Sequence, residues 1–202
     1  MRYSKGDLPI ALYYVHTQIT NLKKSVKMYP SQKAPYKQDN LRLNRKSIPG
    51  ATYAIVKNTR DLNRPIIPDP YQRAWKAAEY RIITESIAWL TDLERWRPIA
   101  CVVLPDHMHI VFELGDKVPL GTLMASFVKY TTRQINILNG WEGPFWQAYY
   151  YDRRVRSYRE FCNQVNYVRR NPVKQGYVRE FEDWPYGWCA EEYRRSEIAD
   201  YG

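Results

Sequence analysis

Two of the three histidines in this 202-residue chain stand one residue apart, within the segment PDHMHIVF. On a strand, side chains two residues apart point to the same face, so His107 and His109 would project together while Met108 projects to the opposite face. Two imidazoles held this close suit a divalent cation. The alternative interpretation is a pair of partly buried histidines with ordinary hydrogen-bond partners.

Composition restricts the other ligands that such a cation would use. A structural zinc site takes four ligands, but the only other histidine is His16 and the chain has no Cys-x-x-Cys motif. We therefore expect an open site whose third ligand is an oxygen or an amide. The three cysteines (Cys101, Cys162 and Cys189) are widely spaced, which argues against a disulfide framework and favours a reducing compartment.

A tyrosine and an asparagine near residue 170 could complete the chemistry. Ser157 and Glu160 form a capping box that predicts the start of a helix, and Pro172 predicts its end near Asn171. Tyr167 and Asn171 are four residues apart and therefore share one helix face. A tyrosine hydroxyl can attack phosphorus, a metal would offset the charge that develops, and Asn171 could be the third metal ligand.

Tyr167 has a rival, and it also has a plain structural interpretation. Tyr130, in the segment FVKYTTRQ, is likewise followed by an amide four residues later, at Gln134. The topology proposed below would place Tyr130 on the sheet face opposite the histidines, which favours Tyr167. With 18 tyrosines in the chain, an ordinary surface tyrosine is the alternative for Tyr167.

The elements that must position these residues follow the order β-α-β-β-α-β-α. The first six match a ferredoxin-like βαββαβ sheet of the α+β class, with the additional C-terminal helix carrying Tyr167. Right-handed crossovers would put the first two helices on one sheet face and leave the other face for this third helix. The patterns predict strands at 48–56, 99–104, 107–114 and 145–156, and helices at 71–94, at 120–138 before Asn139-Gly140, and from 157.

The charge of the chain is strongly positive and unevenly distributed. Residues 1–48 hold ten Lys or Arg and two acidic residues, within a net charge of +10. We divide the chain into a basic N-terminal extension (1–47), one domain (48–188) and a C-terminal tail (189–202). Such a balance indicates an anionic partner, most often nucleic acid, although a solvated tail is the alternative for the extension.

The sequence predicts a cytoplasmic protein without a membrane partner. No segment approaches the ~20 apolar residues that a membrane-spanning helix needs. The N-terminal segment PIALYYV is too short for a signal peptide.

Three segments, VVLPDHMHIVFEL, FWQAYYYDRRVR and VNYVRRNPVKQGYV followed by DWPYGW, carry a family resemblance over about residues 50–188. On them the chain resembles the REP-associated tyrosine transposases, single-tyrosine members of the HUH endonuclease superfamily. The resemblance implies that His107, His109 and Asn171 bind a divalent metal, Mg²⁺ or Mn²⁺, and that Tyr167 is the nucleophile. It also implies cleavage of single-stranded DNA near REP-like hairpins, through a 5′-phosphotyrosine intermediate and a free 3′-hydroxyl.

Further residues around this site are predicted to contact DNA. Basic side chains would neutralise phosphates, and aromatic side chains such as Tyr149–Tyr151 could stack on unpaired bases. For Trp146 the core is the favoured alternative. The predicted DNA-binding set is Trp146, Gln147, Arg153, Arg154, Arg156, Arg169, Arg170 and Lys174.

Three functional hypotheses follow from these patterns. The first is a metal-dependent enzyme, a transposase that nicks and rejoins single-stranded DNA, acting as a monomer or a homodimer. The second is a catalytically silent, domesticated protein that binds DNA hairpins. The third is a small metal-binding domain unrelated to DNA, which the net charge and the arginines disfavour. The four intact candidate residues favour the enzyme.

Overall fold

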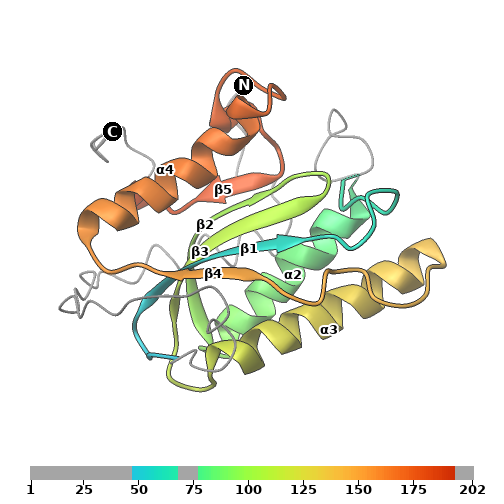
Figure 1. Ribbon diagram of the computed structural model, residues 1–202, viewed down its shortest axis with the longest axis horizontal. Helices are drawn as coiled ribbons and strands as arrows, with labels where there is room; N and C mark the ends of the chain where they lie inside the picture. The colour runs from blue at the N-terminus through green and yellow to red at the C-terminus, as the bar shows by residue number, and fades with distance from the viewer. Residues whose placement is uncertain (1–46, 68–76, 194–202) are drawn as a thin grey trace.

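The computed structural model describes residues 47–67 and 77–193. They form an α+β fold with a five-stranded antiparallel sheet in the order β4-β1-β3-β2-β5 and three helices (Figure 1). The predicted fold class is confirmed, whereas the N-terminal extension and most of the tail lie outside the described residues. The elements are β1 (Thr52–Asn58), α2 (Ala78–Asp92), β2 (Trp96–Val103), β3 (His107–Leu114), α3 (Leu120–Asn139), β4 (Tyr151–Arg154), α4 (Tyr158–Lys174) and β5 (Gly187–Cys189).

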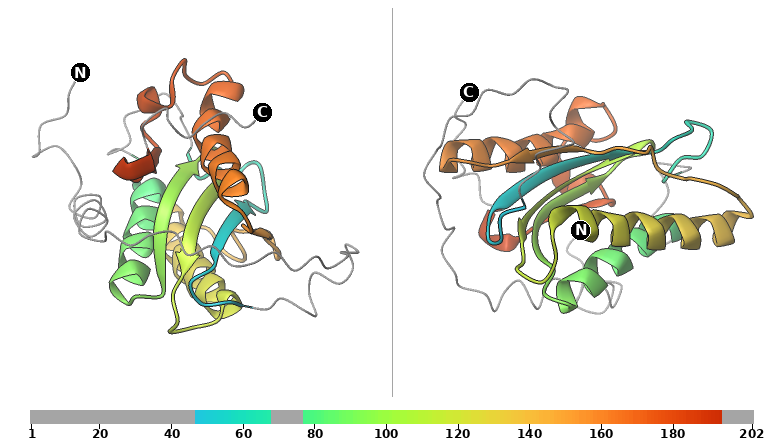
Figure 2. Two further views of the ribbon diagram at one scale, coloured as in Figure 1. Left: turned by 90° about the vertical axis from the view of Figure 1, so that its left-hand side faces the viewer. Right: turned by 60° about the horizontal axis from the view of Figure 1, so that its bottom comes forward.

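The helices cover the two faces of the sheet as right-handed crossovers predict. α2 and α3 pack on one face and α4 crosses the other, as the right-hand view of Figure 2 shows. Phe112 of β3 packs against Trp96, at 4.8 Å between ring centroids, and Trp96 lies 6.2 Å from Phe127 of α3. The apolar side of β3 therefore meets α3, and the histidine side is left for α4.

The hairpin formed by β2 and β3 supports the histidines. β3 begins at His107, as predicted, and is paired on both sides, with β1 and with β2. The turn is closed by the Leu104 N–H, which donates to the His107 carbonyl at 2.8 Å. Both neighbouring strands thus fix the backbone at the histidine pair.

Helix α4 starts where predicted and ends later than predicted. The Ser157 side chain accepts a hydrogen bond from the Glu160 N–H, which confirms the cap. The predicted end near Asn171 is wrong, because the helix continues through Pro172 to Lys174. Asn171 and Pro172 are both buried, and the Tyr177 N–H donates to the Pro172 carbonyl at 3.0 Å. Burial and this closing bond outweigh the local preference against helix before proline.

Several strand bounds differ from the expectation. β1 is Thr52–Asn58 instead of 48–56, and β2 is Trp96–Val103 instead of 99–104. The predicted strand at 145–156 is shorter, Tyr151–Arg154, with one isolated bridge between Thr59 and Trp146. Strand β5 was missed, and it pairs with the outer edge of β2. Trp184, just before β5, donates from its indole N–H to the Val103 carbonyl at 3.0 Å. A three-residue strand leaves no readable alternation in the sequence.

Trp146 belongs to the core, which contradicts its predicted contact with DNA. Its side chain is 2 % exposed, and its indole N–H donates to the Thr131 hydroxyl at 2.8 Å. Its ring lies 5.0 Å from that of Phe145 and 6.2 Å from that of Phe127. The favoured alternative for Trp146, a core residue, is therefore correct.

Replacing Trp146 with Phe is expected to lower the free energy of unfolding by about 2 kcal/mol, because it removes a buried hydrogen bond and leaves a void. DNA affinity should stay unchanged. Urea unfolding and fluorescence anisotropy with a labelled hairpin measure the two quantities. Gln147→Ala, at the exposed neighbouring side chain, is the stability control. Weakened DNA binding by a normally stable Trp146→Phe variant would contradict the core assignment.

Candidate functional site

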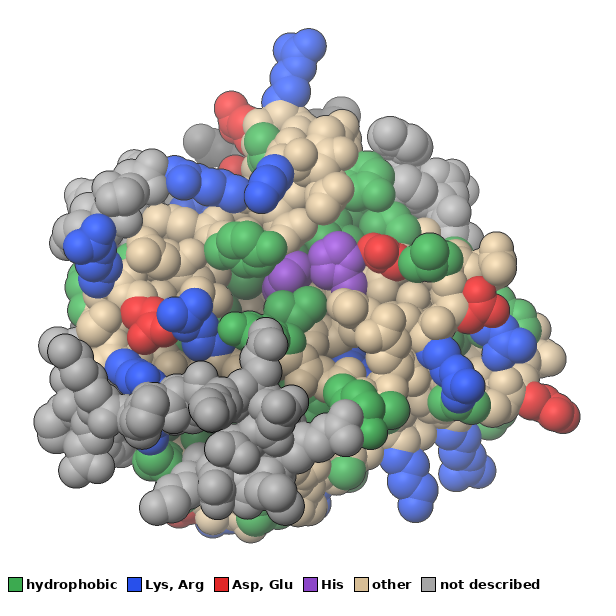
Figure 3. Space-filling view, viewed as in Figure 1, with side chains coloured by type: hydrophobic (Ala, Val, Ile, Leu, Met, Phe, Trp, Pro, Cys, Tyr) green, Lys and Arg blue, Asp and Glu red, His purple; other side chains and the backbone are tan. Residues whose placement is uncertain are grey.

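The structure brings the four predicted chemical residues together at one place. The rings of His107 and His109 lie 4.9 Å apart, and the His109 ring lies 5.2 Å from that of Tyr167. The Asn171 amide nitrogen is 3.0 Å from Nε2 of His109. Figure 3 shows the two histidine side chains next to each other, visible from this side of the molecule and beside hydrophobic side chains.

Two periodicities produce this convergence. Alternation along β3 directs His107 and His109 to the face that α4 covers. Along α4, Gln164, Tyr167 and Asn171 follow one another at intervals of three and four residues, so they form one stripe. The adjacent stripe is apolar and buried, and it fixes the rotation of the helix. That buried stripe consists of Phe161, Val165, Val168 and Pro172.

His109 and Asn171 are the two buried members of the site. His109 is 5 % exposed, and burial lowers the pKa of its imidazole to about 3. The neighbouring His107 also lowers this pKa, while Asp106 raises it. The ring is therefore neutral at pH 7, and a neutral imidazole carries the nitrogen lone pair that a metal needs.

This lowered pKa predicts a loss of stability in acid. Because the folded pKa lies below the unfolded value of about 6.5, the unfolded chain takes up the proton first, and stability falls as the pH drops from 6.5 toward 3. Between pH 7.5 and pH 5 the loss due to His109 should be about 2 kcal/mol. Urea unfolding is measured in EDTA for the wild type and for His109→Gln, whose side chain does not titrate. The difference between the two pH profiles gives the contribution of His109 to the free energy of unfolding. Equal pH dependence of the two proteins would refute the prediction.

His107 is held by a residue that sequence analysis missed. Its Nδ1 lies 2.6 Å from the carboxylate of Asp106, and its side chain is 20 % exposed. A carboxylate on one ring nitrogen orients the imidazole and leaves the other nitrogen for a ligand. The only sequence signal was position, since Asp106 directly precedes the first histidine in the hairpin turn.

The donor set fits a divalent metal only when Asn171 is included. Among residues 47–67 and 77–193, no group of three or more His, Cys, Asp or Glu side chains could hold a metal ion. The Asn171 amide already lies within ligand-to-ligand distance of Nε2 of His109, and turning the amide over would present its oxygen there. Two imidazoles and an amide oxygen leave further coordination positions open, as a catalytic site requires.

A cleft beside Tyr167 opens between α4 and strands β1 and β4. Its volume is about 310 Å³, and its apolar lining residues include Ala54, Val56, Val111 and Val168. The floor is formed by β1 and β3. The walls carry His109, Tyr151, Arg153, Gln164 and Tyr167. We call it the apolar cleft.

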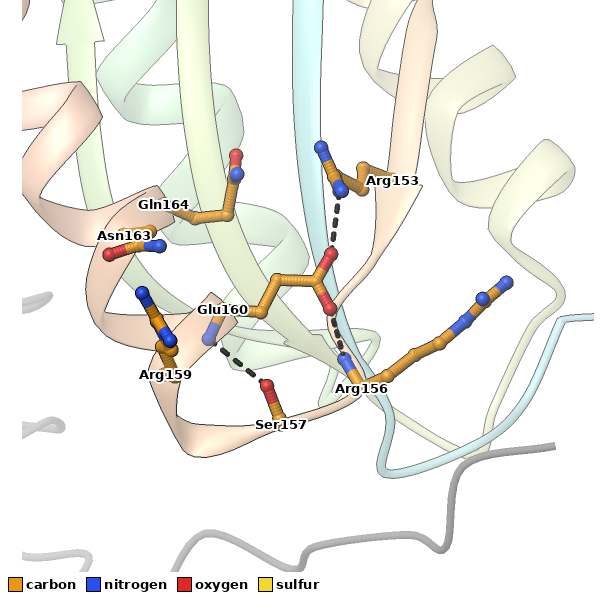
Figure 4. A pocket seen from close by; sticks show the side chains of 7 residues that line it. All are labelled: Arg153, Arg156, Ser157, Arg159, Glu160, Asn163 and Gln164. Carbon is orange, nitrogen blue, oxygen red and sulfur yellow. Dashed lines mark hydrogen bonds and ion pairs between the residues drawn. The ribbon is translucent and has the colours of Figure 1, made fainter. Parts of the chain in front are cut away.

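A second, more basic cleft of about 380 Å³ lies at the start of α4. Arg153 and Gln164 line both clefts, so the two are adjacent. Figure 4 shows Gln164 of α4 and Arg153 of β4 facing each other across the gap between helix and strand. We call it the basic cleft, and its other lining residues are Arg156, Ser157, Arg159, Glu160 and Asn163.

The predicted DNA-binding residues on the β4 side are divided between two locations. Arg153 and Arg156 line the basic cleft. Arg154 pairs with Tyr53 in the register of β1 and β4, whereas Arg153 pairs with Ala54. Because successive residues alternate between faces, the structure does not bring Arg154 to the cleft side. Its predicted contact with DNA at this site is therefore not supported by its position.

The remaining predicted residues lie at the other end of α4 or outside the clefts. Arg170 and Lys174 are exposed and lie three and seven residues after Tyr167, on the same side of the helix. Arg169 is paired with Glu182 at 3.1 Å. The Gln147 side chain is exposed, while its carbonyl accepts from the buried Lys57 ammonium.

The rival tyrosine lies on the opposite face of the sheet. Tyr130 of α3 stacks on Trp89 of α2, with 6.4 Å between ring centroids. It therefore belongs to the layer formed by α2 and α3, away from the histidines. The topological argument against Tyr130 is correct.

Fold and site together describe an α+β protein in which a histidine pair on the sheet faces a tyrosine-bearing helix. Comparison with protein-family models gave no match. The chain is 28 % identical to a REP-associated tyrosine transposase of Escherichia coli K12 over 144 residues, which are 69 % of this chain and 76 % of the relative. It is also 28 % identical to a putative REP-associated tyrosine transposase of Haemophilus influenzae over 98 residues, 44 % of this chain and 56 % of the relative.

A solved structure has the same fold. It is a REP-associated tyrosine transposase bound to a REP hairpin, with a TM-score of 0.56 and 22 % identity over 72 % of this chain and 81 % of the other. The similarity to this group that the sequence motifs predicted is therefore confirmed. No helix within the described ranges is long and apolar enough to cross a membrane.

Proposed function

We propose that this protein is a transposase that binds hairpin DNA and cuts and rejoins adjacent single-stranded DNA, in a metal-dependent reaction through a 5′-phosphotyrosine. The observation that carries the proposal is the contact of His109 on β3 with both Tyr167 and Asn171 on α4. These two elements lie far apart in the sequence. The names of the curated relatives and the DNA in the similar solved structure support a DNA substrate.

Tyr167 is the proposed nucleophile. Its side chain is 49 % exposed, so its hydroxyl is accessible to a DNA strand. In the cleavage step the hydroxyl loses its proton, its oxygen bonds to phosphorus, and the bond from phosphorus to the 3′-oxygen breaks. The departing 3′-oxygen takes up a proton. Rejoining is the reverse attack by a 3′-hydroxyl on the phosphotyrosine, which keeps the bond energy and needs no ATP.

His107, His109 and Asn171 are the proposed metal ligands, with Mg²⁺ or Mn²⁺ as the cation. When bound, the cation would polarise the phosphate and offset charge in the transition state. The protein's own part is to keep His109 neutral by burial and to orient His107 through Asp106. Asn171 is held against His109 by α4.

DNA binding is proposed to use the basic side chains around the site. Arg153 and Arg156 lie at the basic cleft, and Arg170 and Lys174 are exposed beyond Tyr167. Contacts of this kind release counterions from DNA, so affinity should fall steeply with salt. The proposed partner is a REP-like hairpin with a single-stranded flank, and the proposed location is the cytoplasm.

The second candidate is a catalytically silent protein that binds DNA hairpins. The similar solved structure, which is bound to a hairpin, favours binding without deciding on catalysis. This candidate predicts salt-sensitive binding and no covalent product with any metal.

Covalent trapping distinguishes the two candidates. The full chain is incubated with labelled hairpin oligonucleotides that carry single-stranded flanks, taken from the region around its own gene. Each reaction contains Mg²⁺, Mn²⁺ or EDTA. The proposal expects a protease-sensitive adduct on a denaturing gel with metal and none with EDTA. Binding without an adduct under every metal condition would support the silent candidate.

A further inference from the structure

We propose that the apolar cleft binds one unpaired nucleobase next to the cleaved phosphate, and that the amide of Gln164 recognises this base. The basic cleft would take the neighbouring backbone phosphate. This inference rests on the proposed function and assigns a substrate subsite to it. Tyr167 lines the apolar cleft, so a base seated there belongs to a nucleotide at or beside the attacked phosphate.

The shape of the apolar cleft suits a single base. Its volume of about 310 Å³ accommodates one base with part of its sugar, but not a base pair with its backbones. Tyr151 and Tyr167 stand on opposite walls, from β4 and α4, and both are largely exposed. Exposed aromatic rings beside an apolar floor are suited to stacking an unstacked base. A base within a duplex could not enter without leaving its partner.

Gln164 is placed to recognise the edge of such a base. It lies one turn before Tyr167 on the same stripe of α4, and it is half-buried at the junction of the two clefts. A primary amide offers both a donor and an acceptor, which is the combination that base edges match. No other side chain of the apolar cleft carries an amide.

The basic cleft continues the path of the strand. Arg153 reaches both clefts, and Arg156 and Arg159 line the basic one. Glu160 holds Arg153 at 2.6 Å and also accepts from the Arg156 backbone N–H at 2.8 Å, which fixes the arrangement of Figure 4. Three guanidinium groups against one carboxylate leave this cleft positively charged. It therefore suits a phosphodiester.

An abasic scan with two readouts tests the proposal. Hairpin oligonucleotides carry one abasic site at each flank position in turn, and affinity and adduct yield are both measured. One position, within a nucleotide of the cut, should lose about 10-fold in affinity, the size of one lost stacking contact. Bases are then varied at that position for the wild type, Gln164→Leu and Asn163→Leu. Asn163 lines the basic cleft only, so its variant is the matched control.

Gln164→Leu should reduce base discrimination at that position about 10-fold. Discrimination is the ratio of the affinities of one protein for the preferred and the other bases, so a uniform change at the basic cleft, which Gln164 also lines, cancels. Asn163→Leu should discriminate like the wild type. Equal sensitivity at every flank position, or an equal loss by Gln164→Leu on all substrates, would overturn the proposal. If no DNA yields an adduct, the proposed catalysis fails, but the affinity scan still supports or overturns the base subsite.

Discussion

Replacing Tyr167 with Phe will abolish the covalent adduct with hairpin DNA and change the affinity for that DNA less than about 2-fold. The variant lacks only the hydroxyl that would bond to phosphorus. Its ring can keep the packing on His109, at 5.2 Å in the wild type, so the site stays assembled. Adduct yield on a denaturing gel and affinity by fluorescence anisotropy measure the two effects.

Two other tyrosines provide controls for this prediction. Tyr130→Phe alters the opposite face of the sheet, and Tyr151→Phe alters the far wall of the apolar cleft. Both variants should retain adduct formation. If Tyr167→Phe loses DNA affinity to the same degree as it loses adduct yield, Tyr167 acts in DNA binding, and its assignment as the nucleophile is wrong.

Removing the metal site will have a comparably large effect. Chelation by EDTA should reduce adduct formation to background, and His107→Ala should reduce it about 10³-fold, since a metal contributes several kcal/mol to the transition state. His107 is a better position for this substitution than the buried His109. Its side chain is 20 % exposed, so its removal disturbs the packing less. Mn²⁺ binding, followed by electron paramagnetic resonance, gives a readout independent of activity.

The two variants should separate metal binding from nucleophilic attack. Tyr167→Phe should bind Mn²⁺ like the wild type and form no adduct, whereas His107→Ala should lose both. Unimpaired Mn²⁺ binding by His107→Ala would show that the histidine pair is not the metal site. It would leave the pair as structural residues beside Asp106, the alternative that the sequence also allowed.

The location of the site was predictable because it depends on local periodicities. Alternation along β3 separates His109 from Met108, and a four-residue interval joins Tyr167 to Asn171 on α4. The topology then requires only that two helices share one face, which right-handed crossovers ensure. The contact between Asn171 and His109 results from the alternation on β3 together with the four-residue interval on α4.

The features that were missed depend on tertiary contacts. The continuation of α4 beyond Pro172 goes with the burial of that residue in the folded chain, which no local sequence rule contains. Strand β5 is defined by its pairing with the edge of β2, and its three residues are too few to show an alternating pattern in the sequence. The pairing of Asp106 with His107 depends on the turn geometry, and the exclusion of Arg154 from the cleft depends on strand register.

The most direct test of Tyr167 as the nucleophile is to identify the amino acid that becomes joined to DNA. The adduct formed with Mn²⁺ and a hairpin oligonucleotide is digested with trypsin and a nuclease, and the nucleotide-bearing peptide is sequenced by mass spectrometry. We predict one modified peptide, with the phosphate on Tyr167. Attachment at any other residue, such as Tyr151 in the same cleft, would contradict it.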